Sequence, residues 1–205
     1  MTHLVPDRLS RYRDKRDFAA TGEPAGAKDA GHEGDPQFVI QHHRATADHY
    51  DFRLEIDGVL VSWAVPKGPS TDPRVRRMAK RTEDHPLDYA GFEGVIARDA
   101  EGKRQYGSGV VQVWDAGTFR NVSEQRGKDV SAADALEAGH LSFELDGHKL
   151  RGRWSLIRTK GEGMWLLLKK KDADSDARRN PTSTQAESVL TGRTMEQIAD
   201  DESDA

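Results

Sequence analysis

A short segment of the chain gathers residues that are able to bind a metal ion. His43, His49 and Asp51 lie within it, and Arg53 follows two residues later. Imidazole nitrogens and carboxylate oxygens are common ligands of divalent transition metals, and a guanidinium binds phosphate oxygens in a bidentate manner. These residue types therefore favour a metal centre with a cation beside it.

Polar and apolar side chains alternate after His49, which predicts a strand with one buried face. Because side chains alternate across a strand, His49, Asp51 and Arg53 share one face, which we expect to be exposed to solvent apart from a bound ion. Two ligands at positions i and i+2 are close enough to bind one ion. The apolar face comprises Tyr50, Phe52, Leu54 and Ile56.

The third ligand is expected from the preceding strand. His43 lies near the end of that strand, whereas His42 points to the opposite side and is interpreted as a structural residue. A simpler alternative is that all these residues are solvated groups on a half-exposed sheet. The convergence of two imidazoles, a carboxylate and a guanidinium favours a site instead.

A basic segment follows the predicted metal ligands. Five basic residues fall between Arg74 and Arg81, and Lys67 stands at the end of a strand. Such a cluster is often only a solvated loop, but close to a metal centre it favours a phosphate clamp. His85 and Tyr89 follow in a turn before the next strand and are further candidates.

The turn signals predict a mainly β fold with minor helices, in which an antiparallel sheet is closed into a barrel or folded into a sandwich. Asp57-Gly58 and Asp146-Gly147 each predict a hairpin turn, and Ser131 predicts the start of a helix that ends at Gly139. We divide the chain into an N-terminal arm and loop (1–36), a barrel (37–171) and an acidic, mostly disordered tail or linker remnant (172–205). A turn of helix is expected near 194–200.

Composition excludes several classes of site. The chain has 205 residues, no cysteine and a net charge of −4. Thiolate ligands and cysteine nucleophiles are therefore excluded, and no apolar run is long enough for a membrane span. We expect a cytoplasmic protein without a membrane partner.

Most of the segment from 13 to 171 resembles a known family, the 3′-phosphoesterase domain of bacterial DNA ligase D. The similarity rests on the family's motifs in their usual order. These are "KRDF" and "TGEP" (15–24), "FVIQHH" with "HYDFRLEIDGVLVSWAVPKGPS" (38–70), "EDHPLDYAGFEGVI" (83–96), "YGSGVVQVWDAGTF" (106–119), and "GRWSLIR" with "MWLLLKK" (152–170).

The resemblance implies a metal-dependent DNA-end repair enzyme on a β-barrel. It removes 3′-terminal ribonucleotides and 3′-phosphates to leave a ligatable 3′-OH, typically with Mn²⁺, although Zn²⁺ or Co²⁺ would also suit the ligands. Its metal set matches His43, His49 and Asp51. The other positions that it implies for the active site are Arg53, Lys67, Arg77, His85, Tyr89, Arg16, Asp17 and Glu23.

The same resemblance implies the partners: DNA primer-template 3′ ends, a DNA ligase, a repair polymerase and an end-binding protein. We expect a nucleoid-associated monomer, either a stand-alone enzyme or a domain excised from a ligase. The chain departs from the family at Asp48, whose extra carboxylate could weaken DNA contact, and in the longer segment 98–105.

The expected mechanism is Lewis-acid activation of the terminal phosphate, with Arg53 and Arg77 on its oxygens and water as the nucleophile. His85 either protonates the leaving oxygen or donates a hydrogen bond to the phosphoryl group. Two alternatives remain. One is a non-haem iron oxygenase with His49, Asp51 and His85 as a 2-His-1-carboxylate site, and the other is a non-catalytic DNA-end binding module.

Overall fold

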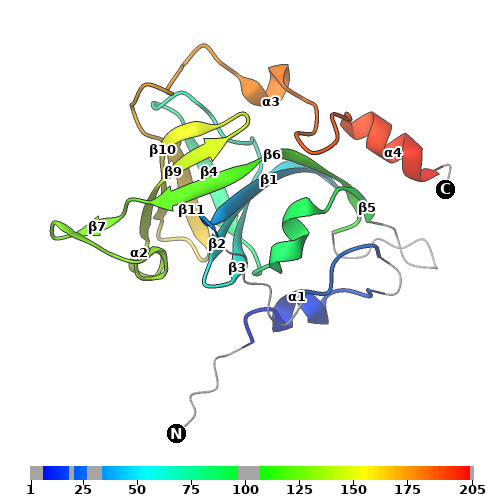
Figure 1. Ribbon diagram of the computed structural model, residues 1–205, viewed down its shortest axis with the longest axis horizontal. Helices are drawn as coiled ribbons and strands as arrows, with labels where there is room; N and C mark the ends of the chain where they lie inside the picture. The colour runs from blue at the N-terminus through cyan, green and yellow to red at the C-terminus, as the bar shows by residue number, and fades with distance from the viewer. Residues whose placement is uncertain (1–6, 19–20, 27–33, 97–106, 204–205) are drawn as a thin grey trace, which may run out of the picture.

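Eight antiparallel strands close into a barrel in the computed structural model, which describes residues 7–18, 21–26, 34–96 and 107–203 (Figure 1). The order around the barrel is β1-β2-β3-β4-β11-β10-β9-β6, and pairing of β6 with β1 closes it. The expected fold class is confirmed. The barrel strands are β1 (Gln37–Arg44), β2 (Asp48–Ile56), β3 (Val59–Val65), β4 (Arg76–Arg81), β6 (Gly109–Asn121), β9 (His140–Gly147), β10 (Arg151–Arg158) and β11 (Met164–Lys169).

The remaining elements are short. Strand β5 (Gly94–Ile96) extends the sheet beside β6, and β7 (Glu124–Gln125) and β8 (Lys128–Asp129) form a separate hairpin. The helices are α1 (Ser10–Asp14), the 3-10 helix η1 (Leu87–Gly91), α2 (Ala132–Ala138), α3 (Pro181–Thr184) and α4 (Met195–Ser203).

The barrel interior is the main hydrophobic core. All eight barrel strands contribute to it, and its largest side chains are fully shielded from solvent. Burial of such aromatic surface is the principal favourable term in folding. Its largest members include Trp63, Trp114, Trp154, Phe52 and Phe143.

A second apolar cluster covers the outside of the barrel where the predicted ligands lie. Tyr12 of α1 and Leu87 and Tyr89 of η1 pack there against Val39 and Leu60 of the sheet. The expectation that this face of β2 is exposed to solvent is therefore wrong. The cause is long-range packing, because the covering residues are far from β2 in sequence.

One of the two predicted hairpin turns is displaced. Asp57 and Gly58 have φ values of 53° and 77° and form the tight β2–β3 turn as expected. Asp146-Gly147, by contrast, belongs to β9, and the link to β10 is formed by residues 148–150. The buried Asp115 carboxylate determines this, because it accepts hydrogen bonds from the amides of Lys149 and Leu150, both at 2.9 Å.

The helix predicted at Ser131 is confirmed. The Ser131 hydroxyl accepts a hydrogen bond from the Asp134 amide at 3.0 Å, which caps the N-terminus of α2. Gly139 ends the helix in the left-handed region with φ of 86°.

The C-terminal segment differs from the expected disordered tail. Residues 172–203, which we call the strap, cross the barrel and end in α4, which packs against β5 and β6 (Figure 1). The Lys149 ammonium donates to the carbonyl oxygens of Gln185 and Glu187, and Met195 and Ile198 are buried. A sequence rich in polar residues concealed this, because main-chain carbonyls make many of the strap's contacts. Among the described residues, no helix is long and apolar enough to cross a bilayer.

Candidate metal centre and active-site cavity

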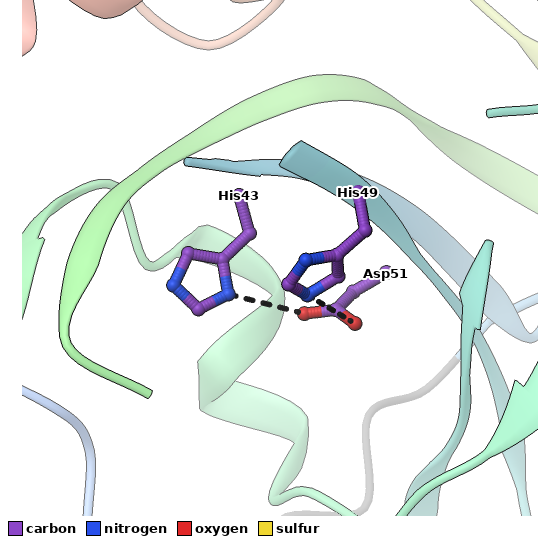
Figure 2. A group of neighbouring side chains, drawn as sticks. All are labelled: His43, His49 and Asp51. Carbon is purple, nitrogen blue, oxygen red and sulfur yellow. Dashed lines mark ion pairs between the residues drawn. The ribbon is translucent and has the colours of Figure 1, made fainter. Parts of the chain in front are cut away.

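The side chains of His43, His49 and Asp51 converge on one point, as Figure 2 shows. Asp51 lies between the histidines, with 3.9 Å from Oδ2 to His43 Nδ1 and 3.5 Å from Oδ1 to His49 Nε2. The strand register explains the convergence, because His43 is directly opposite His49 and Gln41 is opposite Asp51. Direct cross-strand neighbours share a face of the sheet.

Each imidazole is oriented by a backbone carbonyl on its far side. His43 Nε2 donates to the Gly107 carbonyl oxygen at 2.9 Å, and His49 Nδ1 donates to that of Ala47 at 3.1 Å. A carbonyl can only accept, so in the neutral form of each ring the lone pair is on the other nitrogen, which faces Asp51. Orientation of metal-binding histidines by such partners is general in metalloproteins.

These donors suit a divalent transition metal. One ligand atom from each residue lies within 4.8 Å of the other two, and two ligands at about 2.1 Å from an ion can be up to about 4.2 Å apart. Only small movements are therefore needed to bring all three onto one ion. Burial lowers the pKa of His43, with the nearby Asp51 carboxylate partly opposing the effect, and a neutral imidazole is the form that binds metal.

Arg53 is locked beside the three donors. The residue is 2% exposed, and its guanidinium donates to Asp51 Oδ2 at 2.9 Å, to Gln41 Oε1 at 2.7 Å and to Ser62 Oγ at 2.8 Å. Gln41 in turn donates to the carbonyl oxygens of Tyr89 and Phe92, at 3.0 and 2.9 Å. The amide of Gln41 thus joins the strand to η1 and fixes the Arg53 side chain.

A cavity of about 260 Å³ opens over this cluster. Its charged and aromatic lining combines the three donor residues with the cations Arg16 and Arg53, with the Glu83 carboxylate that pairs with Arg16, and with His85 and Tyr89. Ala64, Thr82 and Ile96 complete the wall toward β4 and β5. A pocket with metal ligands on one side and guanidinium groups on another is suited to an anionic group such as a phosphate.

His85 is held as a neutral imidazole at the cavity wall. Its Nδ1 donates to the Glu83 carbonyl oxygen at 3.0 Å, so Nε2 accepts from Arg16 Nη2 at 3.3 Å. Burial lowers the pKa of His85 well below its ordinary value, and the positive charges of Arg53 and Arg16 lower it further. The oxygenase alternative requires His85 beside His49 and Asp51, but His43 occupies that place.

The N-terminal arm contributes a second charged network. Arg16 Nε donates to Glu23 Oε1 at 2.8 Å, and the Tyr89 hydroxyl donates to the same oxygen at 3.1 Å. Arg16 also pairs with Glu83, whose carboxylate is buried. Burial alone would raise the pKa of Glu83, but hydrogen bonds from the backbone and from Lys15 hold it below its ordinary value.

Four predicted residues are not among those that line the cavity: Glu23, which pairs with the lining residue Arg16, and Asp17, Lys67 and Arg77. Asp17 and Lys67 are exposed, and Lys67 follows β3 near its pairing with Tyr50. Arg77 pairs with Leu167 and shares with Ala79 the face of β4 that turns to the core. The alternation of β4 explains this, because basic residues at successive positions point to opposite faces. The unusual segment 98–105 lies outside the described residues.

The sequence interpretation missed several residues that line or support the cavity. Gln41 is fully buried two residues before His43, on the same face of β1, so alternation was the available signal. Glu83 and Tyr12 gave no such local signal, because Glu83 reaches Arg16, and Tyr12 reaches the His85 ring, only after the arm has docked. His42, expected to be structural, stacks on Tyr50 with ring centroids 4.4 Å apart.

A comparison with known protein families shows to which family the chain is related. A model of the DNA Ligase D 3′-phosphoesterase domain matches residues 41–158, more than half of the chain. The chain belongs to this family. The resemblance seen in the motifs is thus confirmed, and the matched segment contains His43, His49, Asp51, Arg53, His85 and Tyr89.

Curated relatives of this DNA ligase D phosphoesterase domain are much longer proteins. The multifunctional non-homologous end joining protein LigD of Pseudomonas aeruginosa is 47% identical over 193 residues, which is 91% of this chain and 22% of that protein. The LigD proteins of Mycobacterium tuberculosis and Mycolicibacterium smegmatis are 44% and 39% identical, over 82% of this chain. The chain therefore spans about a fifth of the length of these relatives. Membership in a family of 3′-phosphoesterase domains indicates hydrolase activity on phosphoesters.

Proposed function

We propose that the chain is a metal-dependent 3′-phosphodiesterase and 3′-phosphomonoesterase that heals DNA ends. It would remove 3′-terminal ribonucleotides and 3′-phosphates and leave a 3′-OH for ligation. The main support for this proposal is that two imidazoles and a carboxylate converge in a cavity that is also lined by two guanidinium groups. Kinship with LigD proteins supports the choice of DNA ends as the substrate.

His43, His49 and Asp51 would hold the cation, for which Mn²⁺ is the first choice and Zn²⁺ or Co²⁺ are alternatives. When bound, a divalent cation supplies Lewis-acid polarisation of a phosphoryl oxygen. The Gly107 and Ala47 carbonyls keep the two imidazoles oriented for that role. The nitrogen and oxygen donor set is compatible with each of these ions.

Arg53 and Arg16 would bind the remaining phosphate oxygens, and their fixed positions reduce the reorganisation needed as negative charge develops. Glu23 and Glu83 keep Arg16 in place, and Gln41 and Ser62 do the same for Arg53. Lys67, on an exposed loop, would contact the nucleic acid outside the cavity. Arg77 and Asp17 stay predictions that rest on the family resemblance.

His85 would act only after substrate has bound. In the structure its Nε2 is an acceptor, whereas protonation of a leaving oxygen and donation to a phosphoryl group both require a proton there. Burial is the larger cause of the lowered pKa of His85 and would persist in the complex, whereas a phosphate dianion between Arg16 and Arg53 would offset the positive charges that lower it further. A proton on His85 Nε2 therefore requires the bound substrate, and water is the proposed nucleophile.

The LigD relatives suggest the cellular setting. They are multifunctional proteins of non-homologous end joining, so we propose that this domain works beside a DNA ligase, a repair polymerase and an end-binding protein. A monomeric, nucleoid-associated domain is proposed on the same basis.

The test uses labelled primer-templates that end in a ribonucleotide, a 3′-phosphate or a 3′-OH, each with Mn²⁺, Zn²⁺, Co²⁺ or a chelator. We expect metal-dependent conversion of the first two to the third. His43→Ala and His49→Ala should abolish it, whereas His140→Ala, an exposed histidine on β9, serves as the matched control. Binding of primer-templates without any metal-dependent product would instead identify a non-catalytic DNA-end binding module.

A further inference from the structure

The outer face of β4 and β11 is an exposed surface that continues from the cavity. Lys80, Met78 and Arg76 on β4 pair with Met164, Leu166 and Leu168 on β11, so these six side chains share one face. We call this surface the β4–β11 face. Met78 is 54% exposed, which makes it one of two large hydrophobic residues that protrude in the described part of the chain.

The strand register links this face directly to the candidate site. Asp51 pairs with Ala64 on β3, and Ala64 pairs with Lys80 on β4, so the three residues form a row across adjacent strands. Ala64 and Thr82 line the cavity, and Thr82 follows Lys80 by two residues, directly after the end of β4. Neighbouring strands are about 4.8 Å apart, which places Lys80 about 10 Å from Asp51.

The cations of this face are not neutralised by the protein. Arg76 and Lys80 are exposed, and neither forms an ion pair within the described ranges of the chain. Nearby arginines differ, since Arg74 pairs with Asp72 and Arg81 with Asp84. Strands β4 and β11 contain no aspartate or glutamate. The face therefore carries positive charge that is available to an anionic partner.

We propose that the β4–β11 face binds the nucleic-acid strand that bears the reacting 3′ end, over the first few nucleotides on the 5′ side of that end. This inference rests on the proposed function and specifies where its substrate runs. Lys80 and Arg76, four residues and about 13 Å apart along β4, contact two backbone phosphates of the same strand that are separated by at least one nucleotide. The Met78 thioether between them lies against a base, a contact that sulfur makes readily with aromatic rings.

A length series of oligonucleotides tests this path. The substrates are 3′-phosphorylated oligodeoxynucleotides of increasing length, beginning with a single nucleotide. For the wild type, KM should fall steeply over the first few nucleotides and then level off. In the double variant Arg76→Ala/Lys80→Ala this gain should be largely lost, so that KM for long substrates rises on the order of tenfold and kcat changes less.

Direct binding separates this proposal from the proposed function. The probe is a fluorescein-labelled single strand ending in 3′-OH, followed by anisotropy with a chelator present, so that no catalysis is involved. The slope of log affinity against log salt should decrease by about 0.7 for each cation removed. If no oligonucleotide of any length is hydrolysed but the variants still change this slope, the proposed function is wrong, whereas the β4–β11 face is still shown to bind the strand.

Matched variants control for charge and for exposed apolar area. Lys128→Ala removes an exposed cation from the β7–β8 hairpin, which projects from the barrel on the side away from β5 (Figure 1). Met78→Ala should weaken binding a few-fold for any base sequence. Its control is Leu190→Ala, which removes a side chain of similar exposure, 56%, from outside the β4–β11 face. Equal effects of the β4 and control variants would overturn the proposal. A β4–β11 face that binds a protein partner would likewise leave DNA binding unchanged and overturn it.

Discussion

Strand β2 presents Phe52 and Leu54 to the barrel interior and Asp51 and Arg53 to the cavity, yet all four side chains are shielded from solvent. Their exposed fractions are 0%, 0%, 8% and 2% in that order. The inner face is buried when the barrel closes. The outer face is buried by the N-terminal arm and η1, which dock over it.

The two faces differ in what burial does to the free energy of folding. Apolar burial stabilises the fold in proportion to area. Burial of a carboxylate or guanidinium costs free energy unless each donor and acceptor is satisfied, so the outer face depends on a complete set of partners. Arg53 illustrates this, because Nε, Nη1 and Nη2 each have an acceptor. The inner face should therefore determine stability, and the outer face function.

The largest effect is expected on activity, from Asp51→Asn. The amide keeps the shape of the side chain and a possible acceptor for Arg53 but is a poor metal ligand. Hydrolysis of a 3′-phosphate primer should fall well beyond the roughly 10–100-fold loss typical of residues that only support a ligand. Titration calorimetry with Mn²⁺ should show a parallel loss of affinity. Wild-type affinity for Mn²⁺ would remove Asp51 from the metal site.

The neighbouring substitution Phe52→Ala should affect stability instead. It leaves a cavity in the barrel interior, and the free energy of unfolding in urea should fall by about 3–5 kcal/mol. The activity of the folded molecules, measured well below the midpoint of thermal unfolding, should change much less than for Asp51→Asn. A loss of stability under 1 kcal/mol would break the distinction between the two faces.

A smaller effect on both quantities is expected from Gln41→Leu. Arg53 Nε and the carbonyls of Tyr89 and Phe92 lose their partner, which should cost about 1–3 kcal/mol of stability. Activity should fall roughly 10–100-fold because Arg53 is no longer positioned.

The matched control for that variant is Gln112→Leu. Gln112 is equally buried on the adjacent strand, but its amide donates to the Arg193 carbonyl oxygen of the strap. It should lose stability without a comparable loss of activity. Equal losses of activity in both variants would show that Gln41 acts through general stability alone.

The smallest effect is expected in the pH dependence of stability. His85 has a pKa well below the ordinary value of 6.5, so the unfolded chain binds a proton that the folded chain does not when the pH falls below about 6.5. Stability should therefore decrease as the pH falls through this range. The decrease should be shallower in His85→Gln, measured as urea midpoints from pH 7.5 to 5. An identical slope in both proteins would show that His85 does not contribute.

The strands and their faces could be predicted because they follow from local alternation. The assignment of His43, His49 and Asp51 to one face needed only period-two geometry and a hairpin partner. The tight turn at Asp57-Gly58 and the cap at Ser131 also depend on adjacent residues. The same logic failed at Asp146-Gly147, where the carboxylate of Asp115, distant in sequence, fixes a later turn.

The sequence by itself determined the antiparallel strands, the three candidate ligands and the family to which they belong, because these are written in local spacing and ordered motifs. Only the tertiary structure decided that the ligand face is buried, that Arg16 and His85 reach it while Arg77 does not, and that the acidic tail is a docked strap. Each of these depends on contacts between segments far apart in the chain. Their free energy comes from packing and paired hydrogen bonds that no local pattern encodes.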